Sequence, residues 1–326
     1  MPAIIWLNYN GMHIIKVIEL SLLSLSSFLK NYGKGLLIVV DNHSTDGSYE
    51  RICNFLNKLN VKYIMVRTRR NLGYSGGMNV GYKIALQEGA KLVVLANNDV
   101  IVFPGALTRL IKYLDKSDKL SGVQGILLRP GGSIDNIGYL IDELLITHPI
   151  KHIDRSPITP TYLSGALAAY KIDVLVECGF RKKLFFDAIP AYFDDVVLGL
   201  KLWNCGYSLA SLPIKVGLHL HSATFSKYSR YRVFNALAAW RALEEVVSTR
   251  FKNILPLIRY KVLARFLTLY GLRKTFKVTL EGIRLGKLYG ELLRRRGLHL
   301  DLYRAPYVRV DYRRLARLLL TVKLGL

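Results

Sequence analysis

The sequence has few cysteines and few acidic residues, and both shortages narrow the class of protein that it encodes. Its three cysteines, Cys53, Cys178 and Cys205, lie far apart in 326 residues and form no Cys-x-x-Cys pair. This spacing excludes a disulfide framework and a zinc knuckle, and it predicts a reducing compartment. Only 23 Asp and Glu residues oppose 47 Lys and Arg residues, so the net charge is +24 and we expect anionic partners.

Long uncharged apolar runs are also missing. The longest candidate, around residues 254–272, is interrupted by Arg259, Lys261 and Arg265, although 51% of all residues are hydrophobic. A membrane-spanning helix needs about 18 or more consecutive apolar residues. The N-terminus shows neither a basic region nor a cleavage site. We therefore expect no spanning helix, no secretory signal and a cytoplasmic protein with a sizeable core.

The first 115 residues alternate short apolar runs with amphipathic stretches. The apolar runs cover residues 3–7, 36–40, 63–66 and 92–95, and the amphipathic stretches cover 14–30, 48–60, 77–89 and 104–115. This alternation predicts right-handed βαβ units and a parallel sheet, which binds ligands at the carboxyl ends of its strands. The polar clusters NYN, DNHSTDGS and NND fall at those ends.

Later segments follow different patterns. Gly and Pro punctuate residues 121–164, which predicts irregular strands and a mobile loop. Residues 236–326 carry 20 Lys and Arg against 6 Asp and Glu and are typical of basic amphipathic helices. In the last predicted helix, an apolar stripe lies beside three arginines. The stripe consists of Tyr312, Leu315, Leu319 and Val322, and the arginines are Arg313, Arg314 and Arg317.

The segment VDNHSTDGS places Asp41 at the end of a predicted buried strand. Ser44, Asp46 and Ser48 fit a helix-capping motif, with Gly47 permitting a tight turn. Capping is also the simpler interpretation of Asp41. We favour a ligand-binding role for Asp41, because a carboxylate at a strand tip can accept hydrogen bonds from a nucleobase or a ribose.

Two further clusters have both a functional and a structural interpretation. RNLGYSGGMNVGY contains four glycines at a helix start, where backbone amides can approach a phosphate closely; a tight turn is the alternative. LANND ends a predicted strand with Asn97, Asn98 and Asp99, whose oxygens suit a hard divalent cation. A turn closed by these residues is the alternative.

The segment YFDDVVLGLKLW places Asp194 and Asp195 at a helix start. Adjacent helical residues point in different directions, so one aspartate can cap the helix while the other acts as a general base. Attraction of both acids to the helix dipole is the alternative. Downstream, His219 and His221 share one face if they lie on a strand.

Taken in order, these motifs resemble the inverting glycosyltransferases of family 2, which have the GT-A fold, and in particular their rhamnosyltransferase-like branch. The resemblance covers roughly residues 3–225. The matching segments are NYN (8–10), VDNHSTDGS (40–48), NLGYSGGMNVGY (71–82), NND (97–99), SGA (164–166), YFDD (192–195), GY (206–207), Pro213 and His219.

The resemblance implies a transfer of a sugar from a UDP-, GDP- or dTDP-sugar to a glycan or lipid-linked acceptor. It implies Asp195 as the catalytic base and Asp99 and His219 as ligands of Mn²⁺ or Mg²⁺. The implied donor-binding residues are Tyr9, Asn10, Asp41, Asn71, Gly76, Asn97 and Asn98. The implied acceptor-side residues are Ser164, Gly165 and Asp194.

The implied fold is α/β, with a Rossmann-like, mainly parallel sheet flanked by helices and a basic helical extension at the C-terminus. We expect a catalytic domain over residues 1–235, divided into a nucleotide-binding half (1–115) and an acceptor and catalytic half (116–235). The tail (236–326) is expected to bind an anionic membrane surface peripherally, at the cytoplasmic face.

The sequence departs from the family pattern in places, and two other functions stay open. Asn97 replaces the usual first acid of the metal motif, and Asp194 replaces a glutamate. Residues 180–182 differ from the usual Phe-Asp-Glu, and about five residues near 187–191 are inserted. A non-catalytic relative that binds nucleotide sugars is one alternative. A basic nucleic-acid-binding protein is the other, but no nucleic-acid-binding motif is visible and we expect no nucleic-acid partner.

Overall fold

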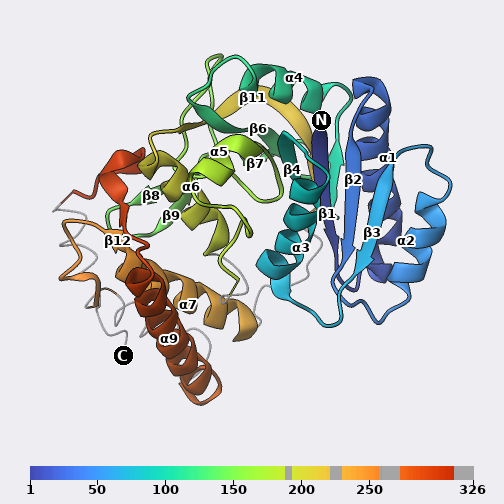
Figure 1. Cartoon of the computed structure of the whole chain (residues 1–326). Coiled ribbons are helices and arrows are strands. Elements are labelled where there is room, and N and C mark those ends of the chain that lie inside the picture. The colour runs from blue at the N-terminus through green and yellow to red at the C-terminus, as the bar shows by residue number, and fades with distance from the viewer. Residues whose placement is uncertain (188–192, 221–229, 257, 259–271, 312–326) are drawn as a thin grey trace. The chain divides into compact units, whose positions relative to one another are not determined.

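A nine-stranded sheet organises the larger part of the computed structural model, which describes residues 1–187, 193–220, 230–256, 258 and 272–311 (Figure 1). The strand order is β3-β2-β1-β4-β10-β6-β11-β5, and β7 pairs with β6. The strands are β1 (Pro2–Asn8), β2 (Leu36–Asp41), β3 (Tyr63–Arg67), β4 (Leu92–Asn97), β5 (Val100–Val102), β6 (Leu120–Leu128), β7 (Ile134–Asn136), β10 (Leu167–Lys171) and β11 (Ser208–His219).

The first four predicted strands are confirmed as β1 to β4, and they pair in parallel. Their register brings the polar residues that follow each apolar run to one edge of the sheet. Asn8 lies opposite Asp41 across the β1–β2 pair, and Leu7 lies opposite Asn97 across the β1–β4 pair. The carboxyl ends of these strands therefore form the edge at which a ligand is expected.

The second half of the sheet is mixed. Within residues 121–164, where irregular strands were expected, β6 is long and regular, whereas the strands that follow it have only three or four residues. β10 runs antiparallel to β4 and β6, while β6 is a nine-residue strand that is buried throughout. A Cβ at Gly122 would lie 2.5 Å from the Tyr170 ring, and one at Gly125 would lie 2.5 Å from the carbonyl oxygen of Ile214. These glycines permit close packing inside a strand, so they do not mark turns.

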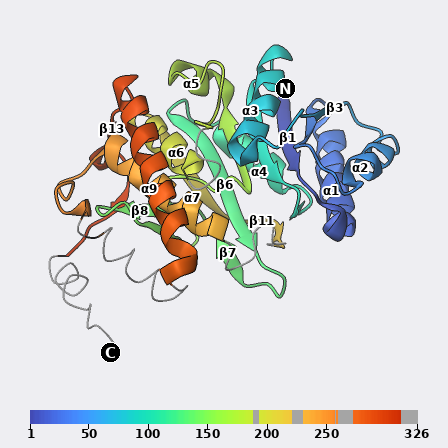
Figure 2. The ribbon, with the colours of Figure 1, turned by 90° about the horizontal axis from the view of Figure 1, so that it is seen from below.

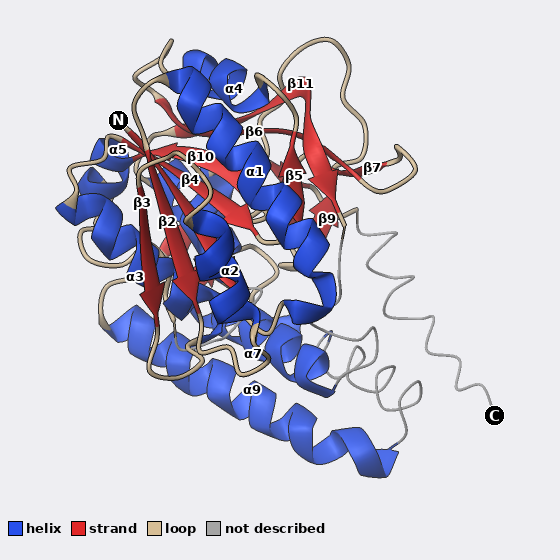
Figure 3. Cartoon of the chain, turned by 90° about the vertical axis from the view of Figure 1, so that its right-hand side faces the viewer, coloured by secondary structure: helices blue, strands red, loops and turns tan. Residues whose placement is uncertain are grey.

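Helices cover both faces of the sheet (Figure 3). Alternate strand residues point to opposite faces: Ile4 and Trp6 pack in one core cluster, Ala3 and Ile5 in another. The first cluster includes side chains of α1 (Ile15–Tyr32), α2 (Ser48–Leu56) and α4 (Ala106–Leu114), and the second those of α3 (Gly73–Gln87), α5 (Ile172–Glu177) and α6 (Asp194–Asn204). The result is a three-layer α/β/α arrangement.

One helical segment of the described residues, Met12–Tyr32, is long and apolar enough to cross a membrane by length and composition. It comprises α1 and the preceding 3₁₀ turn η1 (Met12–Ile14). The expectation of no such segment rested on the absence of a long uncharged apolar run and considered residues 254–272 as the longest candidate, not this helix. Leu22 and Leu25 of this helix are fully buried in the core of the sheet, as in the core helix of a globular domain.

The chain divides into two compact units. The first comprises Met1–Tyr139, Pro149–Pro190 and Asp194–Ser222, and the second comprises Leu140–His148, Ala191–Phe193 and Ala223–Leu326. Elements of the second unit include α7 (Arg230–Val246), α9 (Leu272–Arg295), β12 (Val247–Ser248), β13 (Leu300–Asp301), η2 (Leu302–Arg304) and β14 (Tyr307–Val308). A three-stranded sheet orders β14-β8-β9, where β8 is Tyr139–Asp142 and β9 is Thr147–Pro149.

The division differs from the expected domain boundary at 235/236, because α7 runs through that boundary as one helix. The apolar stripe predicted at residues 312–322 lies outside the described residues. Within the second unit, the buried Glu143 joins segments far apart in sequence. Its carboxylate accepts a hydrogen bond from the Val310 N–H (2.7 Å) and pairs with Arg250 (2.8 Å), while its carbonyl oxygen accepts one from Thr249 (2.7 Å).

Candidate active site

Asp41 is fully buried at the end of β2. Its Oδ1 accepts hydrogen bonds from the Asn8 side-chain amide (3.0 Å) and the Ser44 hydroxyl (2.6 Å), and its Oδ2 accepts one from the Ser44 backbone N–H (2.9 Å). The Arg67 guanidinium lies 3.6 Å from Oδ2. The carboxylate thus holds the turn after β2 in this conformation. Contact with a donor nucleotide stays a prediction.

The turn after β1 is joined to the turn after β2. Tyr9 is half-buried directly after the strand, and Asn10 has a left-handed backbone with φ of 47°. The Asn10 N–H donates to the Ser44 hydroxyl (2.9 Å), and its side-chain oxygen accepts from the Thr45 N–H (2.9 Å). These bonds keep both turns side by side at the predicted nucleotide-binding edge.

Asn97 and Asn98, also predicted to bind the donor, lie at the same edge: Asn97 ends β4 and Asn98 follows it. The Asn98 side-chain amide donates to Asn8 Oδ1 (3.1 Å), which ties the end of β4 to the end of β1. The Asn97 N–H donates to the carbonyl oxygen of Ala166 (3.0 Å). The predicted acceptor-side segment around residue 165 therefore lies directly beside the predicted donor-binding segment.

Asn71 and Gly76 have local structural roles at the start of α3. The Asn71 side-chain oxygen accepts hydrogen bonds from the Asn42 amide (2.9 Å) and the Gly73 N–H (2.8 Å), so it orders the first turn. A Cβ at Gly76 would lie 2.6 Å from the Leu72 Cβ. This glycine is therefore required for packing, and its predicted contact with the donor stays a prediction.

The two aspartates at the start of α6 have different partners. Asp194 Oδ2 accepts a hydrogen bond from the Ser75 hydroxyl (2.7 Å), and its Oδ1 accepts one from the Asp195 backbone N–H (3.2 Å). Asp195 Oδ2 accepts one from the Gly165 N–H (3.1 Å). Asp195 Oδ1 is buried and has no hydrogen-bond partner among the described residues. One acid is thus held in place, while the other keeps an oxygen available.

The surroundings of Asp195 favour its protonated form. Burial, and next the charge of Asp194, raise the pKa of Asp195 well above its ordinary value. Burial and the same two aspartates raise the pKa of Tyr74, whose hydroxyl donates to the carbonyl oxygen of Gly165 (2.8 Å). A buried carboxylate with a raised pKa and an unused oxygen is suited to accept a proton from a substrate.

Asp194, Asp195 and Tyr74 form one cluster of the candidate site, and Asp99, His219 and Asp135 form a second. The antiparallel β5–β11 pair aligns His219 with Val100, directly after Asp99. Imidazole Nε2 lies 3.3 Å from Asp99 Oδ1, and Nδ1 lies 2.9 Å from Asp135 Oδ2. Burial lowers the pKa of His219, but the hydrogen bonds and charges of the two aspartates outweigh it and raise the pKa to about 9. The site therefore attracts positive charge.

The donor set of this cluster fits Mn²⁺ or Mg²⁺. An Nδ1–H bond from His219 to Asp135 would leave Nε2 on the side of Asp99, which is how a carboxylate orients a metal-binding histidine. Among the described residues, no group of three or more His, Cys, Asp or Glu side chains could by itself hold a metal ion. Ions such as Mg²⁺ are usually held by one or two carboxylates and by substrate phosphates, which agrees with so small a set.

Tyr139 and Ser164 connect the two clusters. Burial raises the pKa of Tyr139 to about 12, with further contributions from the charges of Asp135 and Asp195. Tyr139 therefore interacts electrostatically with both clusters. The Ser164 side chain partly offsets this rise in the pKa of Tyr139, and the Ser164 N–H donates to Gln124 Oε1 (2.7 Å). The buried strand β6 thereby fixes the acceptor-side segment.

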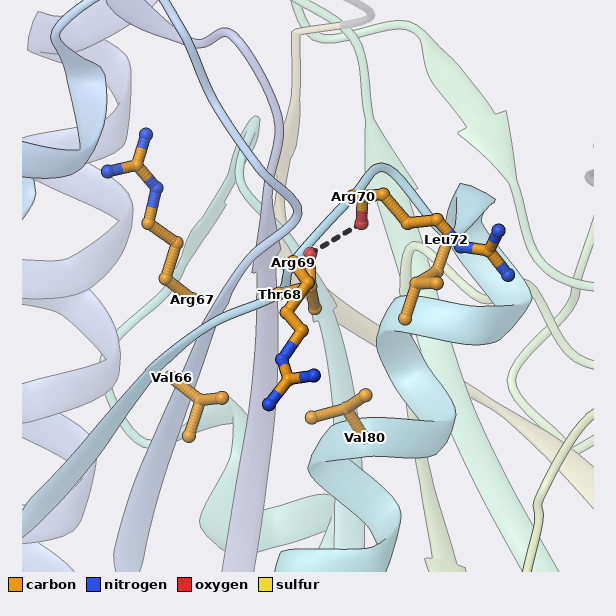
Figure 4. A pocket seen from close by; sticks show the side chains of 7 residues that line it. All are labelled: Val66, Arg67, Thr68, Arg69, Arg70, Leu72 and Val80. Atoms are coloured by element: carbon orange, nitrogen blue, oxygen red, sulfur yellow. Dashed lines mark hydrogen bonds between the residues drawn. The ribbon is translucent and has the colours of Figure 1, made fainter.

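A separate pocket of about 510 Å³ lies at the end of β3 (Figure 4). Its lining residues are Val66, Arg67, Thr68, Arg69, Arg70, Leu72 and Val80. Figure 4 shows the Arg67 guanidinium directed away from those of Arg69 and Arg70; it stacks over the Tyr49 ring at 4.6 Å. No predicted site residue lines the pocket, but Asn71 follows Arg70 directly. Positive charge therefore borders the predicted donor-binding edge.

Sequence reasoning missed Asp135, Tyr74 and Gln124. Tyr74 lies within the glycine-rich motif, which was interpreted through its glycines alone. Asp135 and Gln124 lie in the stretch that was expected to be irregular. The residue types alone carried no signal there, because their roles depend on β6 lying between β10 and β11 and on β7 pairing with β6.

The fold is that of the GT-A glycosyltransferases. The family model described as "Glycosyl transferase family 2" matches residues 4–179, more than half of the chain. The chain therefore belongs to glycosyl transferase family 2. No curated protein matches it in sequence.

Solved structures show the same fold at low sequence identity. GalNAc-T7 with UDP, GalNAc and Mn²⁺ has a TM-score of 0.60 and 14% identity over 92% of this chain, which spans only 58% of that one. TarS 1–349 of S. aureus with UDP-GlcNAc has a TM-score of 0.56 and 15% identity, covering 91% of this chain and 92% of that one. The mannosyltransferase PcManGT of Pyrobaculum calidifontis with GDP-Man and Mn²⁺ has a TM-score of 0.53 and 18% identity, covering 89% and 86%.

Proposed function

We propose that this family 2 glycosyltransferase is a metal-dependent, inverting enzyme of the rhamnosyltransferase-like branch. It transfers a sugar from a nucleoside-diphosphate sugar to a hydroxyl group of a lipid-linked or cell-surface glycan. The reaction takes place at the cytoplasmic face of a membrane, to which the basic tail binds peripherally. The similar structures were solved with UDP, GDP-Man or UDP-GlcNAc, two of them with Mn²⁺, and this supports the donor class and the metal.

The observation that carries the proposal is the unequal pair at the start of α6. Asp194 is held by Ser75, while Asp195 keeps one buried oxygen without a hydrogen-bond partner among the described residues. Asp195 accepts the proton of the acceptor hydroxyl as that oxygen attacks the anomeric carbon from the face opposite the leaving group. A single displacement of this kind inverts the anomeric configuration and needs no covalent intermediate.

Asp99 and His219 hold the cation in this proposal, and Asp135 orients the imidazole through Nδ1. When bound, the cation neutralises charge that develops on the leaving nucleoside diphosphate. Asn97 and Asn98 of the same segment supply amide groups to the donor. Gly165 positions Asp195 through its backbone N–H, and Tyr74 in turn fixes Gly165.

The decisive experiment measures donor hydrolysis with UDP-, GDP- and dTDP-sugars, each with Mn²⁺, with Mg²⁺ and with a chelator. We expect one nucleotide to be preferred and the chelator to abolish turnover. NMR analysis of the first transfer product is expected to show the anomeric configuration opposite to that of the donor. Retention of configuration would contradict the role of Asp195 as a base.

The same screen tests the non-catalytic alternative. A chain that binds a donor in calorimetry, but neither hydrolyses nor transfers it with any metal, would be a binding protein of this fold. The matched control is Asp195→Asn, which is expected to retain donor affinity within a few-fold and to lose transfer. Equal turnover by the variant and the wild type would show that a different group is the base.

A further inference from the structure

The orientation of α9 is fixed by three glycines that recur at every fourth position. Cβ atoms at Gly282 and Gly290 would each lie 2.8 Å from a backbone carbonyl oxygen of α7, and one at Gly286 would overlap a third such oxygen. Small residues at this spacing let two helices approach closely. Figures 2 and 3 show α7 and α9 side by side. One side of α9 therefore packs against α7.

The opposite side of α9 exposes large apolar side chains. Leu280, Leu288 and Leu292 are 48%, 56% and 41% exposed, and they account for three of the seven exposed large hydrophobic residues among the described part of the chain. On a helix with 100° per residue, they fall on an arc opposite the three glycines. Packing on α7 leaves the three leucines of this arc largely exposed among the described residues.

Cationic side chains lie on the same arc. Lys277, Arg284 and Arg295 are exposed and form no ion pair with any described residue, whereas Lys287 and Arg294 have acidic neighbours at 3.8 Å. Because they are spaced by 7 and 11 residues, Lys277, Arg284 and Arg295 lie on one stripe of the helix, among the leucines. Arg294 pairs with Glu245 of α7 and so borders the α7 side. With Lys287, Glu281 and Glu291 counted as well, the arc that faces away from α7 carries four cations against two anions.

We propose that this exposed arc of α9, defined by Leu280, Leu288, Leu292, Lys277, Arg284 and Arg295, is a docking surface for an anionic lipid bilayer. Leucines enter the boundary between headgroups and acyl chains while the cations stay at lipid phosphates. The cations of the arc complement the negative charge of an anionic bilayer. A protein groove would in addition have to match the shape of the helix, so we favour the bilayer. This inference rests on the membrane association in the proposed function, and it names one described helix, instead of the tail as a whole, as the contact.

The test is co-sedimentation of the full-length protein with vesicles of phosphatidylcholine alone and with about one third phosphatidylglycerol. One variant replaces the cations (Lys277→Gln, Arg284→Gln, Arg295→Gln), and a second replaces the leucines (Leu280→Ser, Leu288→Ser, Leu292→Ser). The matched control is Leu20→Ser with Leu23→Ser, which removes two 50% exposed leucines from α1. Circular dichroism checks folding, and donor hydrolysis in detergent-free buffer is measured in parallel.

We expect the wild type and the α1 variant to pellet with anionic but not neutral vesicles. Each α9 variant is expected to bind about tenfold or more weakly. Each basic residue near an anionic surface contributes a severalfold factor, and the leucines contribute by entering the boundary between headgroups and acyl chains. Hydrolysis is expected to be unchanged, so failure of docking and failure of catalysis are separate results. Equal pelleting of all four proteins, or none by the wild type, would overturn the proposal. A dimer that is lost in the leucine variant, without lipid binding, would assign the surface to a second copy.

Discussion

Replacing Gly165 by alanine isolates the positioning of Asp195 from its chemistry. The backbone of Gly165 lies outside the left-handed region, so alanine is not strained by its dihedral angles. Its Cβ, however, would lie 2.8 Å from Asp195 Oδ1 and 3.0 Å from Oδ2, and it would overlap the Tyr74 hydroxyl. The added methyl group thus occupies the space between the proposed base and the tyrosine that supports it.

The size of the effect follows from these distances. Ordinary contact begins at 3.4 Å, so Asp195 Oδ1 must move by 3.4 − 2.8, or about 0.6 Å. A misplacement of about 1 Å can lower a rate by about 10²-fold, so we expect kcat to fall by roughly ten- to a hundredfold. Overpacking is expected to cost about 1–3 kcal/mol of stability as well.

Steady-state transfer, with kcat and the donor KM determined separately, is the appropriate assay. The matched control is Gly81→Ala, whose Cβ would overlap the Ile5 side chain in the core and touches no candidate site residue. It is expected to lose stability while the folded fraction keeps its kcat. If Gly165→Ala kept kcat within twofold of the wild type, the placement of Asp195 beside Gly165 would not matter for the reaction.

Four further outcomes are expected. Asp195→Asn is expected to abolish transfer yet raise the melting temperature at pH 7. A buried acid with a raised pKa destabilises the fold as pH rises through that pKa, and asparagine removes this effect. The gain in melting temperature should therefore shrink at acidic pH. For the same reason the wild-type rate should fall on acidification at a higher pH than an ordinary carboxyl would give, and an acid limb near pH 4 would contradict this. Asp99→Ala is expected to weaken cation-dependent donor binding severely and His219→Ala less, as measured by calorimetry with and without Mn²⁺. Arg250→Ala leaves the buried Glu143 without its ion pair and is expected to cost about 1–3 kcal/mol in denaturant unfolding, given that Arg250 is itself 40% exposed.

Local patterns were sufficient for the first half of the sheet. The apolar runs of 63–66 and 92–95 are strands because they are short, rich in Ile, Val and Leu, and followed by polar residues that end them. β6 escaped the same reasoning. Its two glycines resemble turn residues in sequence, and only the ring of Tyr170 and the backbone near Val216, both brought there by other strands, explain them.

The sequence by itself determined the parallel half of the fold, the acidic pair Asp194 and Asp195, and the strand-end residue Asp99. Each rests on short-range periodicity or on a motif whose members are neighbours in the chain. Only the tertiary structure decided which oxygen of the pair stays without a partner and which carboxylate stands behind His219. Asp135 lies 84 residues from that histidine, and the parallel pairing of β11 with β6 and the antiparallel pairing of β7 with β6 bring them together. Burial in the same fold raises the pKa of Asp195, because the surrounding residues remove the hydration of its carboxylate.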